Sequence, residues 1–372
     1  MKRLLTVFAV LVSIALACGS ASPDPSPFPT QTERLTTATS VFDTSHTQYG
    51  FFPSPPVFNE ESVLSHFQDL GEHADFILLQ PNVPWAGFLD NPQGDSKAKT
   101  DIKNQMILAE MNGLAAIFVV DPLNGLNRRE FHNLPQGWEP SFSNPDVRKS
   151  YKQFVHWIVE EFEPGYLGLA SEINTYMDAH PRDVEHFHSL YREVYREVKD
   201  RAPETQIFVT FQWDDLNNMF AAASEGRSAY DPNWEQIQRF EPELDLWVIS
   251  SYPYFVYENG EDIPGDYYAR LRDKTDKPLA VAEGGFTSLR GEGDQTAYLQ
   301  TIHDQLGERM VFWVYLILSD LNMQNLSGVM KEQGVPEDDI QTLRHFATIG
   351  LQTSNGDAKP ALETWERYRR EE

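Results

Sequence analysis

The stretch Tyr166-Leu167-Gly168-Leu169-Ala170-Ser171-Glu172 is an apolar run that ends in a carboxylate. A second run of the same kind, Pro278-Leu279-Ala280-Val281-Ala282-Glu283, follows later in the chain. Successive side chains of a strand point to opposite faces, so Glu172 shares a face with Gly168 and Ala170, and Glu283 shares one with Leu279 and Val281. Both carboxylates are therefore predicted to point inward at the mouth of one barrel. A pair of solvated glutamates at strand ends is the plainer alternative for either run alone.

Strand-like and helix-like patterns alternate through the region from 45 to 372, and no break in composition divides it. Alternation of this kind indicates parallel strands joined by helical crossovers, and the length suits one eight-stranded barrel. The sequence therefore predicts an α/β fold, a single (β/α)₈ TIM barrel. Its expected strands are Tyr49–Phe52, Phe76–Gln80, Ala115–Val120, Tyr166–Glu172, Ile207–Phe211, Leu246–Ser251, Leu279–Glu283 and Val311–Leu316.

Two of the expected helices carry clear start signals. Asn59 followed by two glutamates predicts a capped start, and Gly71 is expected to end that helix. Asn144 followed by Pro145 predicts a second start of the same type.

The chain begins with a charged and then apolar segment, residues 1–17, that reads as a secretion signal and is short for a membrane span. Its end, Ala15-Leu16-Ala17-Cys18, resembles a bacterial lipobox, and Cys18 is the sole cysteine. We therefore expect Cys18 to be lipidated, with plain cleavage after Ala17 as the alternative. Residues 18–44 are rich in proline, serine and threonine and are expected to form a disordered tether. The predicted location is outside the cytoplasm, at the cell surface or in the periplasm, and the protein is expected to be a monomer.

The residues that follow the strands are rich in aromatic rings and amides. In a parallel barrel these positions converge on one end, where flat rings and hydrogen-bonding groups suit a polyhydroxylated sugar ring. The predicted substrate-binding residues are Asn174, Tyr176, Trp85, Trp213, Tyr252, Tyr254 and Trp313. The long connection from Asp121 to Asn144, which contains Asn124, Arg128, Arg129, His132 and Trp138, is expected to form part of the cleft wall.

Other kinds of chemistry find little support in the sequence. His186 and His188 lie two apart on a helix and have no companion cluster, so no metal is expected. No glycine-rich phosphate loop and no Gly-x-Ser-x-Gly motif is present, so we expect no nucleotide cofactor and no serine nucleophile. The formal net charge of −26 disfavours binding to nucleic acid and is compatible with a neutral polymer.

Three short motifs resemble the retaining glycoside hydrolases built on (β/α)₈ barrels, most of all the arabinogalactan endo-β-1,4-galactanase family. They are Gly168 to Asn174, Ser250-Ser251-Tyr252-Pro253-Tyr254, and Ala280 to Phe286. The resemblance implies that Glu172 is the acid/base and Glu283 the nucleophile. Two departures stand out: Ser171 lies where that group of enzymes has Asn, and Gln80-Pro81-Asn82 lies where it has an Arg that supports the nucleophile.

We therefore expect a membrane-tethered glycoside hydrolase that cleaves a β-linked polysaccharide, with arabinogalactan or β-1,4-galactan as the substrate that the resemblance implies. The two departures favour a second hypothesis, a tethered carbohydrate-binding lipoprotein whose barrel has lost or weakened its chemistry. A third is a structural surface lipoprotein without a ligand, which predicts that the aromatic residues are buried.

Overall fold

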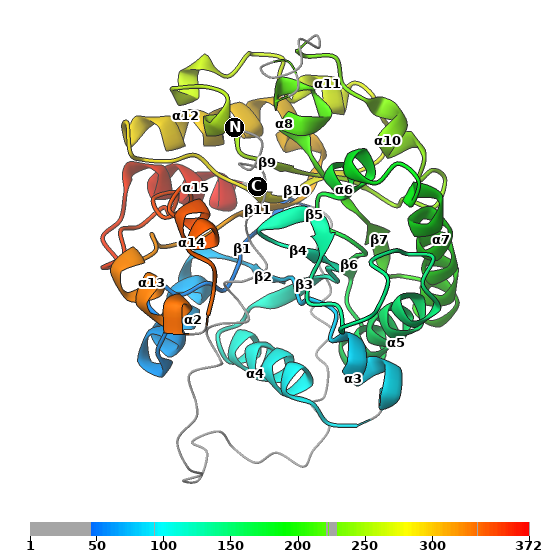
Figure 1. The fold of residues 1–372 in the computed structure, drawn as a ribbon. Coiled ribbons are helices and arrows are strands. Elements are labelled where there is room, and N and C mark those ends of the chain that lie inside the picture. The colour runs from blue at the N-terminus through cyan, green and yellow to red at the C-terminus, as the bar shows by residue number, and fades with distance from the viewer. Residues whose placement is uncertain (1–45, 93, 221, 223–228, 333, 372) are drawn as a thin grey trace.

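The centre of the molecule is a ring of parallel strands enclosed by helices (Figure 1). The computed structural model describes residues 46–92, 94–220, 222, 229–332 and 334–371. The strands form one nine-stranded sheet in the order β7-β6-β3-β2-β1-β11-β10-β9-β8. Their bounds are β1 Gln48–Phe51, β2 Phe76–Leu79, β3 Ala115–Val119, β6 Tyr166–Gly168, β7 Gln206–Phe208, β8 Thr210–Gln212, β9 Trp247–Ser251, β10 Leu279–Gly284 and β11 Met310–Tyr315.

The two ends of this sheet are consecutive parts of the chain, because only Val209 separates β7 from β8. β7 pairs with β6 and β8 pairs with β9, both in parallel. The Thr210 amide also donates to the Ala170 carbonyl at 3.1 Å, so the run crosses from one neighbour to the other and closes the ring. The predicted barrel is confirmed, and its fifth strand is the one that is divided into β7 and β8.

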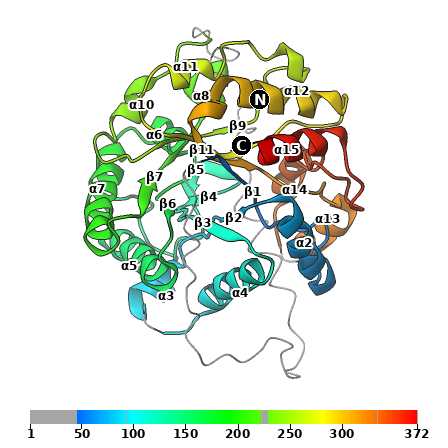
Figure 2. The ribbon, with the colours of Figure 1, turned by 180° about the vertical axis from the view of Figure 1, so that it is seen from behind.

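Helices surround the ring on the front and the back views (Figures 1 and 2). They are α2 Glu60–His73, α3 Trp85–Asp90, α4 Lys97–Met111, α5 Pro145–Phe162, α6 Ile173–Ala179, α7 Val184–Arg201, α8 Trp213–Leu216, α10 Trp234–Gln238, α11 Ala269–Arg272, α12 Gly293–Leu306, α13 Met323–Glu332, α14 Glu337–Leu343 and α15 Pro360–Glu371, with short 3₁₀ turns at η1 Pro253–Phe255, η2 Gly260–Asp262 and η3 Gly307–Arg309.

The predicted helix starts are confirmed, and one predicted end is wrong. Asn59 accepts the Ser62 amide at 2.8 Å, and the Asn144 side chain accepts the Asp146 amide at 3.0 Å. α2 does not end at Gly71 but continues to His73. Gly71 allows a close approach, because a Cβ there would lie 2.7 Å from the Asn112 carbonyl oxygen.

Aromatic rings fill the barrel interior on the side away from the carboxyl ends of the strands. Phe312 of β11 lies 6.0 Å from Phe76, 5.3 Å from Tyr166 and 5.7 Å from Phe208 between ring centroids. Gly168 leaves space for this layer, since a Cβ there would lie 2.9 Å from the Phe208 ring. The aromatic layer fills the barrel beneath the polar residues at the carboxyl ends of the strands, so these residues cannot be reached through the barrel interior.

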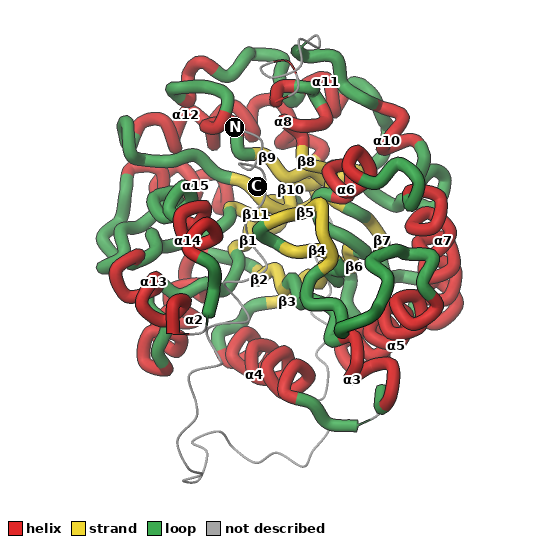
Figure 3. The backbone as a smooth tube through the Cα atoms, viewed as in Figure 1, coloured by secondary structure: helices red, strands yellow, loops and turns green. Residues whose placement is uncertain are grey.

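A hairpin that the sequence analysis missed follows β3. It consists of β4 Leu123–Asn124 and β5 Asn127–Phe131, which form their own two-stranded antiparallel sheet. Figure 3 shows this hairpin in front of the ring of strands, near its centre. The connection that was expected to form a cleft wall therefore includes a hairpin that reaches over the barrel.

The N-terminal predictions concern a part of the chain that the structure does not describe. The signal segment 1–17, Cys18 and the tether 18–44 all lie outside the described residues. Within the described ranges, no helix has the length and apolar character needed to cross a bilayer.

Candidate active site

Glu172 follows β6 after a short link and is the residue just before α6, with its backbone in the left-handed region (φ 47°, ψ 44°). This conformation is unfavourable for a residue with a side chain and is typical of functional sites where the surroundings hold it in place. Here the Glu172 amide donates to Thr210 Oγ1 at 2.8 Å. The fold thus holds the Glu172 side chain at the carboxyl end of the barrel at some local cost.

Glu283 lies within β10, whose register against β9 shifts between Val281 and Glu283. Tyr252, directly after β9, donates its hydroxyl to Glu283 Oε1 at 2.7 Å. The second oxygen, Glu283 Oε2, is buried and has no hydrogen-bond partner among the described residues. Tyr252 is the predicted site residue that the structure brings to Glu283.

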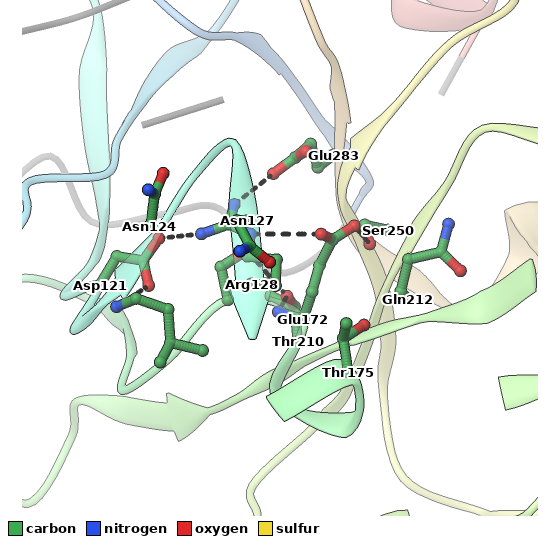
Figure 4. A network of polar contacts seen from close by, with 12 residues as sticks. Asp121, Asn124, Asn127, Arg128, Glu172, Thr175, Thr210, Gln212, Ser250 and Glu283 are labelled. Carbon is green, nitrogen blue, oxygen red and sulfur yellow. Dashed lines mark hydrogen bonds and ion pairs between the residues drawn. The ribbon is translucent and has the colours of Figure 1, made fainter. Parts of the chain in front are cut away.

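Arg128, from the hairpin strand β5, lies between the two glutamates (Figure 4). Its Nε donates to Glu172 Oε2 at 3.2 Å, and its Nη2 lies 3.7 Å from Glu283 Oε2. Its Nη1 donates to Asp121 Oδ2. Because one guanidinium bridges the two glutamates, their carboxyl groups lie within the range of up to roughly 9.5 Å that glycosidase carboxyl pairs span. The two glutamates that the sequence singled out therefore face one shared centre.

Asp121 and Ser250 complete the polar cluster. Asp121 lies just beyond the end of β3 and accepts hydrogen bonds from the Gln80 side chain at 3.1 Å and the Leu123 amide at 3.0 Å. Ser250 donates its hydroxyl to Glu172 Oε1 at 2.5 Å. Both oxygens of Glu172 therefore accept a hydrogen bond, whereas only one oxygen of Glu283 does.

The charges of the cluster do not balance, because three carboxylates surround one guanidinium. Burial raises the pKa of Glu172, while Arg128 and Ser250 act in the opposite direction. Burial and the negative charge of Glu172 raise the pKa of Glu283 to about 8, against the opposing effect of Arg128 and Tyr252. The pair thus holds a proton at neutral pH. The pattern of donors places that proton on Glu283, whose Oε2 accepts no hydrogen bond.

The variant Glu283→Gln should be more stable than the wild type at pH 8, by roughly 4 kcal/mol, and about equally stable near pH 4.5. A carboxyl group whose pKa is higher in the folded state loses stability as pH rises from its unfolded pKa through its folded pKa, and glutamine does not titrate. Urea unfolding at several pH values measures the difference. A stability gap that stays constant between pH 4.5 and 8 would contradict the raised pKa.

The sequence predicted that Glu283 lacks a supporting arginine at the end of the second strand, and this prediction was incomplete. The expected position carries Gln80, which contacts Asp121 instead. Arg128 reaches Glu283 from the hairpin after the third barrel strand, a route that strand-end motifs do not reveal. The signals available in the sequence were only a long connection and an arginine seven residues after the end-of-strand Asp121.

Most of the predicted substrate-binding residues are engaged within the protein. Asn174 joins two segments, because its amide exchanges hydrogen bonds with the backbone of Gln212. Tyr176 donates to Asp183 at 2.6 Å, and Trp85 donates to the His132 carbonyl at 2.7 Å. Trp213 is buried between the rings of Trp234 and Tyr267, and Tyr254 is half-buried against Phe255. Their role in substrate binding stays a prediction.

Trp313 points away from the two glutamates. It is fully buried, and its ring packs against Trp365 of α15 at 5.3 Å and against Tyr49 at 6.0 Å. Its neighbour Phe312 points into the barrel, so alternation along β11 places Trp313 on the outer face. The structure therefore does not bring Trp313 into the candidate site.

Comparison with known proteins supports the class of fold. No family model matches the chain, and no curated protein matches it. Among solved structures, the exo-β-1,4-mannosidase Op5Man5 from Opitutaceae bacterium strain TAV5 matches with a TM-score of 0.64 and 14% identity over 88% of this chain, which spans 60% of the mannosidase. A GH5_18 protein from Bifidobacterium longum subsp. longum, solved with Manβ1-4GlcNAc, matches with a TM-score of 0.63 and 14% identity, covering 88% of this chain and 78% of that one.

A family 39 glycoside hydrolase from Bacteroides cellulosilyticus WH2 also matches, with a TM-score of 0.53 and 16% identity over 88% of this chain and 64% of that chain. The described part of the chain thus has the TIM-barrel fold found in glycoside hydrolases of families 5 and 39. At this level of identity the likeness concerns the fold, and the activity has to be argued from the site.

Proposed function

We propose that the protein is a retaining glycoside hydrolase with Glu172 and Glu283 as its catalytic pair. The observation that carries the proposal is the pair itself, two buried carboxyl groups bridged by Arg128 at the carboxyl end of a TIM barrel. Active sites of this fold lie at that end, and carboxyl pairs perform glycosidic cleavage. Mere binding of a sugar would not require two carboxyl groups that share a proton.

In this mechanism Glu283 attacks the anomeric carbon, and Glu172 first protonates the leaving oxygen and then deprotonates the incoming water. Tyr252 holds Glu283 Oε1 and so fixes the direction of attack. Ser250 holds Glu172 Oε1, and its hydroxyl can also accept a hydrogen bond once Glu172 is protonated. The chemistry requires the proton on Glu172, so it must leave Glu283 before cleavage.

We propose a β-linked polysaccharide as the substrate. Similarity of the three sequence motifs to galactanases favours arabinogalactan or β-1,4-galactan, whereas the matched mannosidase and the GH5_18 complex favour β-mannosides as the second choice. The decisive experiment is a panel of β-1,4-galactan, arabinogalactan, β-mannan and their oligosaccharides, with product analysis and with binding measured on the same panel. Failure to release sugar from any β-linked glycan would remove the proposal.

A binding protein without activity is the second candidate, and one observation favours it. The carboxyl groups are almost sealed in the structure, with Glu172 3% and Glu283 2% exposed. A binding-only protein would retain one of the glycans of the panel and release no product, and the panel therefore separates the two functions.

We also propose that Cys18 carries a lipid anchor and that residues 18–44 tether the barrel to a membrane. The support is the lipobox-like end of the signal segment and the proline-rich stretch that follows it. Cys18→Ala should move the protein from the membrane fraction to the soluble fraction without changing its unfolding temperature, because several acyl chains bind a membrane stably and an unlipidated tether does not. Fractionation of cells followed by detection of the protein measures this. A variant that remains in the membrane fraction would show that another feature anchors the chain.

A further inference from the structure

The catalytic pair is closed off by the hairpin β4–β5. Arg128, Asp121 and Ser250 are each 0% exposed, and Glu172 and Glu283 are almost fully buried beside them. The guanidinium of Arg128 lies between the two carboxyl groups, where a glycosidic bond must lie during cleavage. A sugar can therefore reach both carboxyl groups only after Arg128 moves.

The hairpin is attached firmly at its base. The Asn82 side chain donates to the Asp121 and Leu123 carbonyls at 3.2 and 3.0 Å. On the other strand, Phe131 packs against an aromatic cluster, with its ring 4.7 Å from Phe142 and 5.9 Å from Trp85. These contacts fix the points where the hairpin leaves the barrel.

The tip of the hairpin is attached differently. Its turn is closed by internal bonds, in which the Leu126 amide donates to Asn124 Oδ1 at 2.8 Å and the Arg129 amide donates to Asn127 Oδ1 at 3.3 Å. Arg128 is the residue near the tip whose side chain contacts Glu172 and Glu283, while Leu126 is buried in the turn and the Arg129 carbonyl lies 2.6 Å from His180 Nε2. A two-stranded hairpin is marginally stable by itself, so its position depends on such a connection.

We propose that the segment from Leu123 to Phe131 is a gate over the catalytic pair and that Arg128 is its latch. In the closed state Arg128 bridges Glu172 and Glu283. In the open state the tip swings away on its fixed base, and Arg128 keeps its ion pair with Asp121, which lies at that base. This inference rests on the proposed function, because it takes Glu172 and Glu283 as the pair that a glycan must reach.

Opening also changes which carboxyl group holds the proton. Among the described residues, Arg128 forms ion pairs with three carboxyl groups at the carboxyl end of the barrel: Asp121 after β3, Glu172 after β6 and Glu283 in β10. When Arg128 leaves, Glu172 loses a donor at Oε2, and its protonated form becomes more favourable. Glu283 also loses the nearby charge of Arg128, but it loses no hydrogen bond, and it keeps the hydroxyl of Tyr252, which favours its ionised form. The gate therefore couples access of the glycan to transfer of the proton onto Glu172.

Hydrogen–deuterium exchange of the full-length protein tests the gate without any sugar. In Arg128→Met the amides of the hairpin should exchange at least tenfold faster than in the wild type, while those of β10 keep their protection. Arg129→Met is the matched control, because Arg129 is the exposed neighbour on the same strand, and it should behave like the wild type. Equal protection of the hairpin in Arg128→Met and the wild type would overturn the latch. If Arg128→Met also loses protection in β10, Arg128→Gln replaces it, because glutamine is polar but carries no charge, and unchanged hairpin exchange in that folded variant overturns the latch equally.

A second measurement labels carboxyl groups with a water-soluble carbodiimide and an amine. Labelling of Glu172 and Glu283 should be negligible in the wild type and should rise severalfold in Arg128→Met.

A third measurement repeats the hydrogen–deuterium exchange of the wild type with β-1,4-galactotetraose or β-1,4-mannotetraose. A tetrasaccharide that binds should accelerate exchange at the tip of the hairpin, and binding with the hairpin fully protected would overturn the gate. If neither sugar binds, the proposed function fails on these glycans, while the exchange and labelling of Arg128→Met still decide the gate.

Discussion

Glu283→Ala will reduce glycoside hydrolysis to the detection limit on every substrate that the wild type cleaves. In the proposed mechanism the carboxylate of Glu283 attacks the anomeric carbon, and the methyl group of alanine cannot act as a nucleophile. Tyr252 would remain in place, but its hydroxyl would no longer have a carboxylate to which it can donate a hydrogen bond. The measurement is the initial rate of product release on the glycan identified by the panel and on its aryl glycosides.

A matched control is Glu193→Ala, which removes a surface carboxylate that pairs with Arg148 and Lys152 on the outer helices. It should retain the wild-type rate, since surface ion pairs contribute little. Retention of a substantial fraction of the wild-type rate in Glu283→Ala would refute its assignment as nucleophile.

Glu172→Ala will lose about 10²- to 10⁴-fold in rate on natural glycans, because the leaving oxygen then departs without a proton. Glycosides with activated leaving groups should be affected much less in the first step, since such groups leave as anions. The second step also lacks its base, so azide, which attacks without losing a proton, should accelerate turnover and form a glycosyl azide. Rates for a series of aryl glycosides, with and without azide, measure these effects.

This leaving-group dependence separates a proton donor from a residue with a structural role. A structural defect would lower the rate on all substrates alike, and azide would not restore it. If Glu172→Ala shows the same loss for good and poor leaving groups, Glu172 is not the acid.

In the closed state that we propose, the hydrogen-bond donors around the pair favour a protonated Glu283 and an ionised Glu172, the reverse of what the proposed mechanism needs. Arg128 and Ser250 together satisfy both oxygens of Glu172 and so favour its ionised form. A protein that closes its catalytic centre in this way binds substrate with an affinity reduced by the small fraction of open molecules. The two mutations above should therefore be studied at substrate concentrations high enough to open the gate.

The strand pattern was sufficient to predict the barrel and its two glutamates. Apolar runs of the length of a strand, separated by helix-like stretches, determine an α/β barrel because each parallel strand needs a crossover before the next. Alternation within Gly168 to Glu172 and within Leu279 to Glu283 predicts that both carboxylates point inward. In the structure both side chains do face one centre, but the alternation is interrupted by the register shift between Val281 and Glu283 and by the left-handed backbone of Glu172. The apolar runs are local properties that a single sequence reveals, whereas these two interruptions are not. The same alternation, applied to Phe312 and Trp313, would have placed Trp313 outside.

Only the tertiary structure decided what surrounds the pair. Arg128 lies far from Glu172 and Glu283 along the chain, and its burial depends on a hairpin whose position over the barrel no local pattern specifies. The ionisation of Glu172 and Glu283 also depends on the tertiary structure, because their desolvation and mutual repulsion arise only when the closed barrel brings them together. The sequence by itself determined the strands and the residues at their ends, whereas long-range packing determined which charges meet, because electrostatic interactions depend on distance in space and not on separation along the chain.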